Sequence, residues 1–224
     1  MGMSHKVHHV SDAEKQRLAE AAPRTWQRML SGRRLNLVDP SPLDVEIADI
    51  ALALSRTMRW NGQTSGAHGW SVAQHAELVV HILRQIEPRA PASLLMAGLL
   101  HDGPEYVTHD LITPLKHVVG DVFKEVEDRL QCAINVRFGL PARLSTEDAA
   151  LVKKADVIAG ATEAVQLAGF TDTEVKRVLG MKEKPLRAHP LTPLPSKDAE
   201  AHFLELFAYL QKKMTLECGK HLKS

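Results

Sequence analysis

Two histidines and two aspartates stand where predicted helices would turn them toward the protein interior. His101 and Asp102 end an apolar stretch, Ala92 to Leu100, whose composition predicts a central helix. Adjacent helix residues point about 100° apart, so this helix end can offer a nitrogen and an oxygen to one cation. A mixed imidazole and carboxylate set suits Mn, Fe, Co, Ni or Zn better than calcium.

The two other candidate ligands fall on different predicted helices. His75 lies on the apolar face of a helix that begins at Ser71, and Asp156 on the inner face of one that Ser145 caps. A buried imidazole needs a partner, and a buried carboxylate is costly unless it is paired or bound to a metal. Each residue alone is more often a satisfied core residue. Three helices that each place such a group inward favour a shared metal site.

Helical periodicity extends through most of the chain. Helices are expected over about 41–60, 71–87, 92–100, 114–139 and 145–169, and from 196 onward, with a short one around 13–22. No segment shows convincing period-two alternation, so no strand is expected. The predicted fold class is all-α, a single helical bundle over residues 41–218 with a short N-terminal extension over 1–40.

The composition excludes several classes of protein. A net charge of +1 on 224 residues gives no bulk attraction to a nucleic acid polymer or an anionic membrane. Cys132 and Cys218 lie far apart and fit no zinc spacing, which is typical of a reducing compartment. No apolar run approaches the ~20 residues of a membrane helix, so a cytoplasmic protein is expected. His5, His8 and His9 fit a polar chain start better than a metal site.

The order His75, His101-Asp102, Asp156 resembles the H…HD…D pattern of the HD-domain phosphohydrolases, and most closely the bacterial HD-domain 5′-deoxynucleotidases. The segments that carry it are Ser71–His75, His101–Glu105, Thr108–Lys116 and Leu151–Asp156, with Arg59-Trp60 upstream. The D-L-x-T-P-x-K part of the third segment is the most specific, and the HD pair the least. The resemblance implies a helical HD domain with one divalent metal ion on His75, His101, Asp102 and Asp156.

The resemblance also implies an activity, the removal of the 5′-phosphate from deoxynucleoside monophosphates by water that the metal activates. Glu105 would be the general acid or base, and Asp110 would assist at the sugar or at the attacking water. Arg59 would bind the phosphate, Trp60 would pack on the deoxyribose and help exclude a 2′-hydroxyl, and Lys116 would add positive charge near the phosphate. A homodimer is expected from the same resemblance.

Other interpretations of these residues stay open at this point. Arg59 and Trp60 could be a surface cation with its stacking partner, Lys116 a solvated lysine, and Glu105 a local cap or ion-pair partner. A second pair, His109-Asp110, follows a polar turn, so the metal is assigned to the first pair.

Three local features depart from the family pattern. A glutamate usually precedes the first ligand histidine, where this chain has Gln74. The loop Asn61–Trp70 is rich in glycine and hydroxyl residues and carries His68, and Gly103-Pro104 replaces the small residues often found there. These changes lie beside the expected pocket, so they bear on substrate identity more than on metal binding.

Three alternative functions remain. An HD hydrolase could act on deoxynucleoside triphosphates or guanosine tetraphosphate, although Tyr106 stands after Glu105 where enzymes of the latter kind usually have a carboxylate. An HD scaffold could bind metal and a nucleotide as a sensor without turnover. A plain helical interaction protein would have to satisfy the inward-facing His75 and Asp156 by hydrogen bonds alone.

Overall fold

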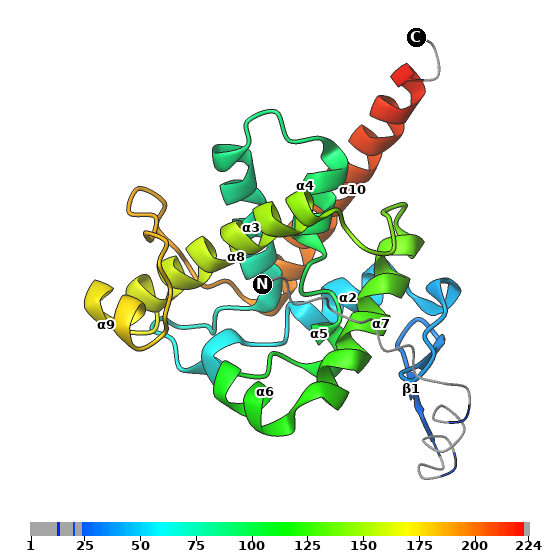
Figure 1. The fold of residues 1–224 in the computed structure, drawn as a ribbon, viewed down its shortest axis with the longest axis horizontal. Coiled ribbons are helices and arrows are strands. Elements are labelled where there is room, and N and C mark those ends of the chain that lie inside the picture. Colours follow the sequence, from blue (N-terminus) through cyan, green and yellow to red (C-terminus); the bar gives the residue numbers. More distant parts are fainter. Residues whose placement is uncertain (1–12, 14–19, 21–23, 222–224) are drawn as a thin grey trace, which may run out of the picture.

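The computed structural model describes residues 13, 20 and 24–221 and shows a bundle of α-helices beside one small hairpin (Figure 1). The all-α prediction is therefore confirmed. The helices that build and surround the site are α2 (Ile47–Leu54), α3 (Val72–Ile86), α4 (Ala92–Leu99), α5 (Glu105–Thr108), α6 (Thr113–Val119), α7 (Asp121–Arg137), α8 (Thr146–Gln166), α9 (Asp172–Arg177) and α10 (Ser196–His221).

Helix α3 is the centre of the bundle and packs against α4, α8 and α10. Ser71 caps it by accepting a hydrogen bond from the Gln74 backbone N–H, as the sequence predicted. Its predicted inner face is buried, and Val72, His75 and Val79 are fully inaccessible to solvent. The long helix α10 crosses behind α2, α3 and α4 and buries Phe203 and Leu210 against them (Figure 1). Two of the metal-ligand candidates, His101 and Asp102, thus come just after α4, and His75 lies on the neighbouring helix α3.

The close packing of α3 on α4 depends on Gly98. A methyl group at this position would overlap Cδ1 of Leu83, which is itself fully buried on α3. Because glycine has no side chain, the two helices can approach more closely here than any other residue would permit. This approach occurs between the helix that carries His75 and the helix that His101 directly follows.

The hairpin formed by β1 (Trp26–Arg28) and β2 (Arg34–Asn36) corrects the expectation that the chain has no strands. The strands pair antiparallel with Gln27 opposite Leu35. Leu35 is fully buried and Met29 nearly so, and both join the main hydrophobic core. Strands of three residues are too short for an alternating pattern to show. Residues 29–36 therefore contribute to the core, and the predicted division into 1–40 and 41–218 stays a prediction.

Two predicted helices are each broken in the structure. In place of one helix over 41–60, Ser41 caps a 3-10 turn, η1 (Pro42–Asp44), and α2 begins only after an extended Val45 and ends at Leu54. A second 3-10 turn, η2 (Arg59–Gly62), carries Arg59 and Trp60. The predicted helix over 114–139 is divided into α6 and α7 by Gly120, whose φ is +80°. Such a φ is compatible with glycine and ends a helix.

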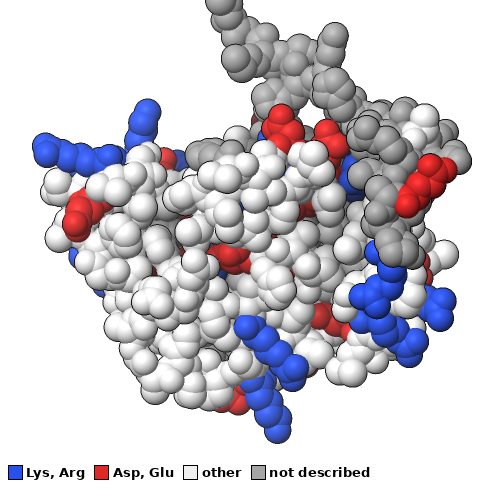
Figure 2. Space-filling model, turned by 90° about the horizontal axis from the view of Figure 1, so that it is seen from below, with Lys and Arg blue, Asp and Glu red and all other residues white. Residues whose placement is uncertain are grey.

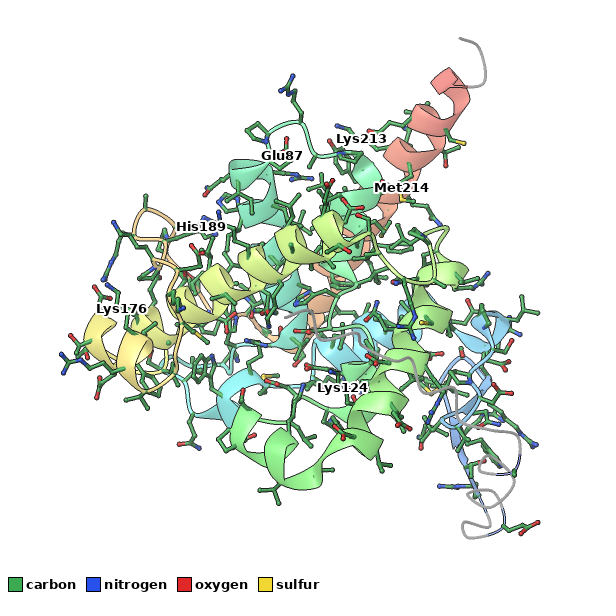
Figure 3. All side chains as sticks on the ribbon, in the orientation of Figure 1. Glu87, Lys124, Lys176, His189, Lys213 and Met214 are labelled. Carbon is green, nitrogen blue, oxygen red and sulfur yellow. The ribbon has the colours of Figure 1, made fainter. Side chains whose placement is uncertain are left out.

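The segment after α9 is tied to the bundle by side-chain amides. Gln74 of α3 donates to the Thr192 carbonyl and accepts from the Leu194 backbone N–H, at 3.0 and 3.1 Å. On the same segment His189, labelled in Figure 3, stacks on His81 of α3 with ring centroids 4.3 Å apart. Gln74, where the family pattern has a glutamate, therefore serves as a bridge that needs both an amide donor and an amide acceptor.

The described surface carries no extended positive band on the face drawn in Figure 2, where lysines and arginines lie mainly at the margins. Among the described residues, no helix is both long enough and apolar enough to cross a bilayer. The histidine cluster at 5–9 and the short helix expected over 13–22 fall outside the described part of the chain, except for two residues of the latter.

Candidate metal centre

Four side chains from three parts of the chain converge beside α3. The Nε2 atoms of His75 and His101 lie 3.3 Å apart. Asp156 Oδ1 is 3.3 Å from the first of these nitrogens and 3.9 Å from the second, while Asp102 Oδ2 is 3.4 and 3.2 Å from them. His75, His101 and Asp156 form a group whose donor atoms all lie within 4.8 Å of one another; Asp102 falls outside it yet contacts both imidazoles.

The hydrogen bonds at Nδ1 of each ring determine whether Nε2 is available to bind a metal. His75 Nδ1 lies 2.6 Å from a carboxylate oxygen of Glu163, and His101 Nδ1 lies 2.9 Å from the Gly98 carbonyl oxygen. Both partners only accept, so each Nδ1 carries the proton and donates it. When both imidazoles are neutral, as metal binding requires, each Nε2 is a lone pair, and two lone pairs and two carboxylate oxygens face one another. Burial alone would lower the pKa of each imidazole, but the neighbouring carboxylates outweigh it and raise that pKa.

A divalent cation bound between these four donor atoms would accept their lone pairs and balance the charge of the two carboxylates. Ligand atoms about 2.1 Å from one ion lie about 3.0 Å apart at right angles and about 3.4 Å apart at tetrahedral angles. Four of the five separations given above fall between 3.2 and 3.4 Å. The side chain of His75 is fully buried and those of Asp102 and Asp156 are about four-fifths buried, so neutralising them by solvent alone would be inefficient. The donor set therefore fits a transition-metal ion.

Glu163 is a site residue that the sequence analysis missed. It lies on α8 seven residues after Asp156, two turns along the same face, and its side chain is fully buried. One oxygen accepts from His75, and the other accepts from Arg59 Nε at 2.8 Å and from Trp60 Nε1 at 3.1 Å. Burial alone would raise the pKa of Glu163, but the charges of Arg59 and His75 outweigh it and lower that pKa to about 2. The sequence signal that could have identified Glu163 is a lone carboxylate in a stretch of α8 whose other residues are mostly small or apolar.

Arg59 and Trp60 are placed beside the cluster by a strained backbone. Trp60 and Asn61 have φ values of +59° and +50°, which are uncommon for residues other than glycine. The Trp60 ring packs against Phe170 at a centroid distance of 5.7 Å. Arg59 Nη1 lies 3.7 Å from Asp102 and 4.0 Å from Asp110, close enough for attraction but beyond hydrogen-bond length. This end of the guanidinium is therefore available to an anion, and the interpretation of the pair as a simple surface cation and its stacking partner is wrong.

Glu105 lines a cavity of about 170 Å³ next to the cluster. The cavity is lined by His101, Asp102, Pro104, Glu105, Lys116, Glu127, Asp128 and Gln131. Only 4% of Glu105 is exposed, and its Oε2 is buried without a hydrogen-bond partner. Burial, and then the charges of Asp102 and Asp110, raise the pKa of Glu105 to about 9. The position and unused oxygen suit a group that exchanges a proton with something in the cavity.

Asp110 and Lys116 complete the surroundings. Lys116 Nζ lies 3.6 Å from Glu105 Oε1 and 3.6 Å from Glu127 Oε1, so it is not simply a solvated lysine. Asp110 follows His109, whose φ of 61° and ψ of 162° belong to a region that is essentially restricted to glycine. The His109 ring makes none of the contacts of the cluster described above. All nine residues predicted from the sequence thus lie in or beside this region, while their individual roles stay predictions.

The helical fold together with this cluster defines an HD-domain phosphohydrolase. Residues 53–193 match the family model described as 5′-deoxynucleotidase YfbR-like, so the chain belongs to the YfbR-like family. Two relatives are similar to this chain in sequence. An uncharacterized protein of Rhodobacter capsulatus is 48% identical over 157 residues, which cover 70% of this chain and 80% of that protein. The uncharacterized protein YfdR of Escherichia coli K12 is 37% identical over 120 residues, covering 54% of this chain and 60% of YfdR.

Proposed function

We propose that this protein removes the 5′-phosphate from deoxynucleoside monophosphates, using one divalent metal ion held by His75, His101, Asp102 and Asp156. The observation that carries the proposal is the convergence of two imidazole Nε2 atoms and two carboxylate oxygens beside Arg59 and the unpaired Glu105 oxygen. The family of 5′-deoxynucleotidase YfbR-like proteins supports the nucleotide substrate.

In this proposal each chemical task falls to a named group. A divalent cation at the cluster would polarise a phosphoryl oxygen and make water easier to deprotonate. Arg59 holds the phosphate with Nη1 while Glu163 keeps its Nε fixed, and Asp110 contacts the sugar or the attacking water. Glu105 takes a proton from water or gives one to the leaving oxygen through Oε2. Trp60 covers the deoxyribose and leaves no room for a 2′-hydroxyl.

Charge in the cavity favours a monophosphate over longer phosphate chains. Glu105, Glu127 and Asp128 line it, and Lys116 is the single cationic side chain among the lining residues. That lysine is already shared between two glutamates. Triphosphates and guanosine tetraphosphate carry several negative charges that would need more cations than this lining offers. These alternatives therefore rank below the nucleoside monophosphate.

The test is phosphate release from a panel of nucleotides by the protein loaded with Mn²⁺ or Co²⁺. Deoxynucleoside monophosphates should be hydrolysed, and the matching ribonucleotides and triphosphates should not. Glu105→Gln should lower kcat by about 10²- to 10⁴-fold, the usual contribution of a positioned acid or base, while Co²⁺ affinity stays unchanged. Glu127→Gln, which alters another carboxylate of the cavity lining, is the matched control and should retain most of kcat. If the protein binds metal and nucleotide without turnover, the proposed hydrolase is wrong and the alternative of a nucleotide sensor is favoured.

We further expect a homodimer and a cytoplasmic location. Helical enzymes of this class commonly pair through a twofold axis. Exposed apolar residues gather on α6 and the first turn of α7, where Leu115, Val118, Val119 and Val122 are 45%, 82%, 46% and 67% exposed. Sedimentation velocity at micromolar concentration measures the state directly, and a single species of about 25 kDa would refute the dimer.

A further inference from the structure

Glu163 connects the metal cluster to the substrate-binding pair, and both of its oxygens are fully committed. Oε1 accepts from His75 Nδ1 at 2.6 Å. Oε2 accepts from Arg59 Nε at 2.8 Å and from Trp60 Nε1 at 3.1 Å. The side chain is inaccessible to solvent, so no water can substitute for any of these three donors. Glu163 contacts no other ligand candidate and has no free oxygen to offer a metal.

We propose that Glu163 is the positioning residue of this site, holding His75 in the tautomer that binds metal while fixing Arg59 and Trp60 with its other oxygen. The inference rests on the metal centre of the proposed function and adds a residue to it. A ligand histidine needs a partner that accepts from its second nitrogen, because that hydrogen bond determines which nitrogen keeps its lone pair. Here the same carboxylate sets the direction of the guanidinium expected to receive the phosphate.

The geometry predicts what an amide would do in place of this carboxylate. Arg59 Nε–H and Trp60 Nε1–H both point at one oxygen, so Glu163→Gln would place its carbonyl oxygen on their side. The amide NH₂ would then face His75 Nδ1 and donate to it. The imidazole proton would move to Nε2, the nitrogen that faces His101 and the carboxylates. The variant would thus keep size and hydrogen bonds yet present a proton where the metal should bind.

The experiment measures Co²⁺ binding to the full chain by calorimetry and by the visible absorption of the bound ion. Glu163→Gln should weaken Co²⁺ binding by about 10- to 100-fold, the usual effect of losing a partner of a ligand histidine. The unfolding temperature of the metal-free protein reports whether the fold is intact. Glu77→Gln is the matched control, since Glu77 is a largely buried carboxylate on α3 whose charged neighbour is Glu205 of α10, away from the cluster. It should bind Co²⁺ like the wild type.

Trp60→Phe supplies a second variant should Glu163→Gln fail to fold. It removes the indole donor to Glu163 but keeps an aromatic ring against Phe170, and the hydrogen bond of the Trp60 side chain goes to Glu163 and not to a ligand candidate. Co²⁺ binding should weaken by about two- to tenfold, which corresponds to the roughly 0.5–1.5 kcal/mol of a typical hydrogen bond, because the lost bond acts on the metal only through Glu163. In the double variant the Trp60→Phe effect should shrink, because the two residues act through one contact.

The outcomes separate this inference from the proposed function. Wild-type Co²⁺ affinity in both Glu163→Gln and Trp60→Phe overturns the positioning role. A wild type that binds no Co²⁺ also overturns it. If wild-type protein binds Co²⁺ and Glu163→Gln loses it, but no deoxynucleotide is hydrolysed, the positioning role stands and the substrate proposal fails.

Discussion

Replacing Gly98 by alanine tests whether the contact between α3 and α4 sets the geometry of the metal cluster. In an open helix this change stabilises by about 1 kcal/mol, because alanine has the higher helix propensity. Here the added methyl overlaps Leu83 Cδ1, so this fully buried side chain must change its rotamer or the two helices must separate. Overpacking of this kind costs about 1–3 kcal/mol, so the net loss should be up to about 2 kcal/mol.

The same substitution should weaken metal binding. We expect α4 to move away from α3 to accommodate the methyl, and His101 to move with it because its Nδ1 donates to the Gly98 carbonyl. The separation of 3.3 Å between the two Nε2 atoms would then increase. We expect Co²⁺ affinity to fall by about tenfold, at the lower end of what misplacing a ligand produces.

Thermal unfolding and Co²⁺ calorimetry measure both effects. A loss of up to about 2 kcal/mol corresponds to a decrease in Tm of up to roughly 8 °C for a chain of this length. Gly219→Ala is the control, because Gly219 is also in a helix and a methyl there meets no neighbouring atom. It should leave Co²⁺ affinity unchanged and Tm unchanged or slightly higher. A Gly98→Ala protein with wild-type Tm and wild-type Co²⁺ affinity would refute the reasoning.

Three further predictions concern the surroundings of the site. Gln74→Glu should lower the free energy of unfolding by about 1–3 kcal/mol, since a carboxylate cannot donate to the Thr192 carbonyl; equal urea midpoints for the two proteins would contradict this. His109→Gly should relieve about 1–3 kcal/mol of backbone strain and raise Tm, while the greater freedom of Asp110 raises KM for the nucleotide; a lower Tm would show that the ring contributes more than the strain costs. Removing divalent metal with EDTA should lower Tm by roughly 5–11 °C, relative to protein with free metal at about a hundred times its Kd. Equal Tm values in calorimetric scans with and without chelator would contradict this.

Helical periodicity was sufficient to find the four ligand candidates. His75 and Asp156 interrupt apolar faces, and His101-Asp102 ends an apolar helix, so each is visible within one local window. The chain order of these windows then carried the family resemblance, which the family match over 53–193 confirms. The fold class, and the convergence of the candidate ligands, could therefore be predicted without coordinates.

Contacts between distant segments could not be predicted in the same way. Arg59 and Glu163 are 104 positions apart, and nothing in the periodicity of either segment indicates their partner. The hairpin was missed because its strands are only three residues long. The division between α6 and α7 was visible in principle, since Gly120 stands within an otherwise helical pattern, but a single glycine is often tolerated in helices.

Helix α10 has a consequence for anyone who wishes to work with a shortened protein. The family match ends at residue 193, just before this helix begins at Ser196. Yet α10 covers α2, α3 and α4, and near its far end Glu217 accepts a hydrogen bond from the backbone N–H of Ala92 at the start of α4. A fragment that ends at the family boundary would expose to solvent the apolar faces of α2, α3 and α4 that α10 covers. It would also lose the hydrogen bond at the start of α4. The stretch recognised by homology is thus smaller than the piece that must be expressed to obtain a folded enzyme.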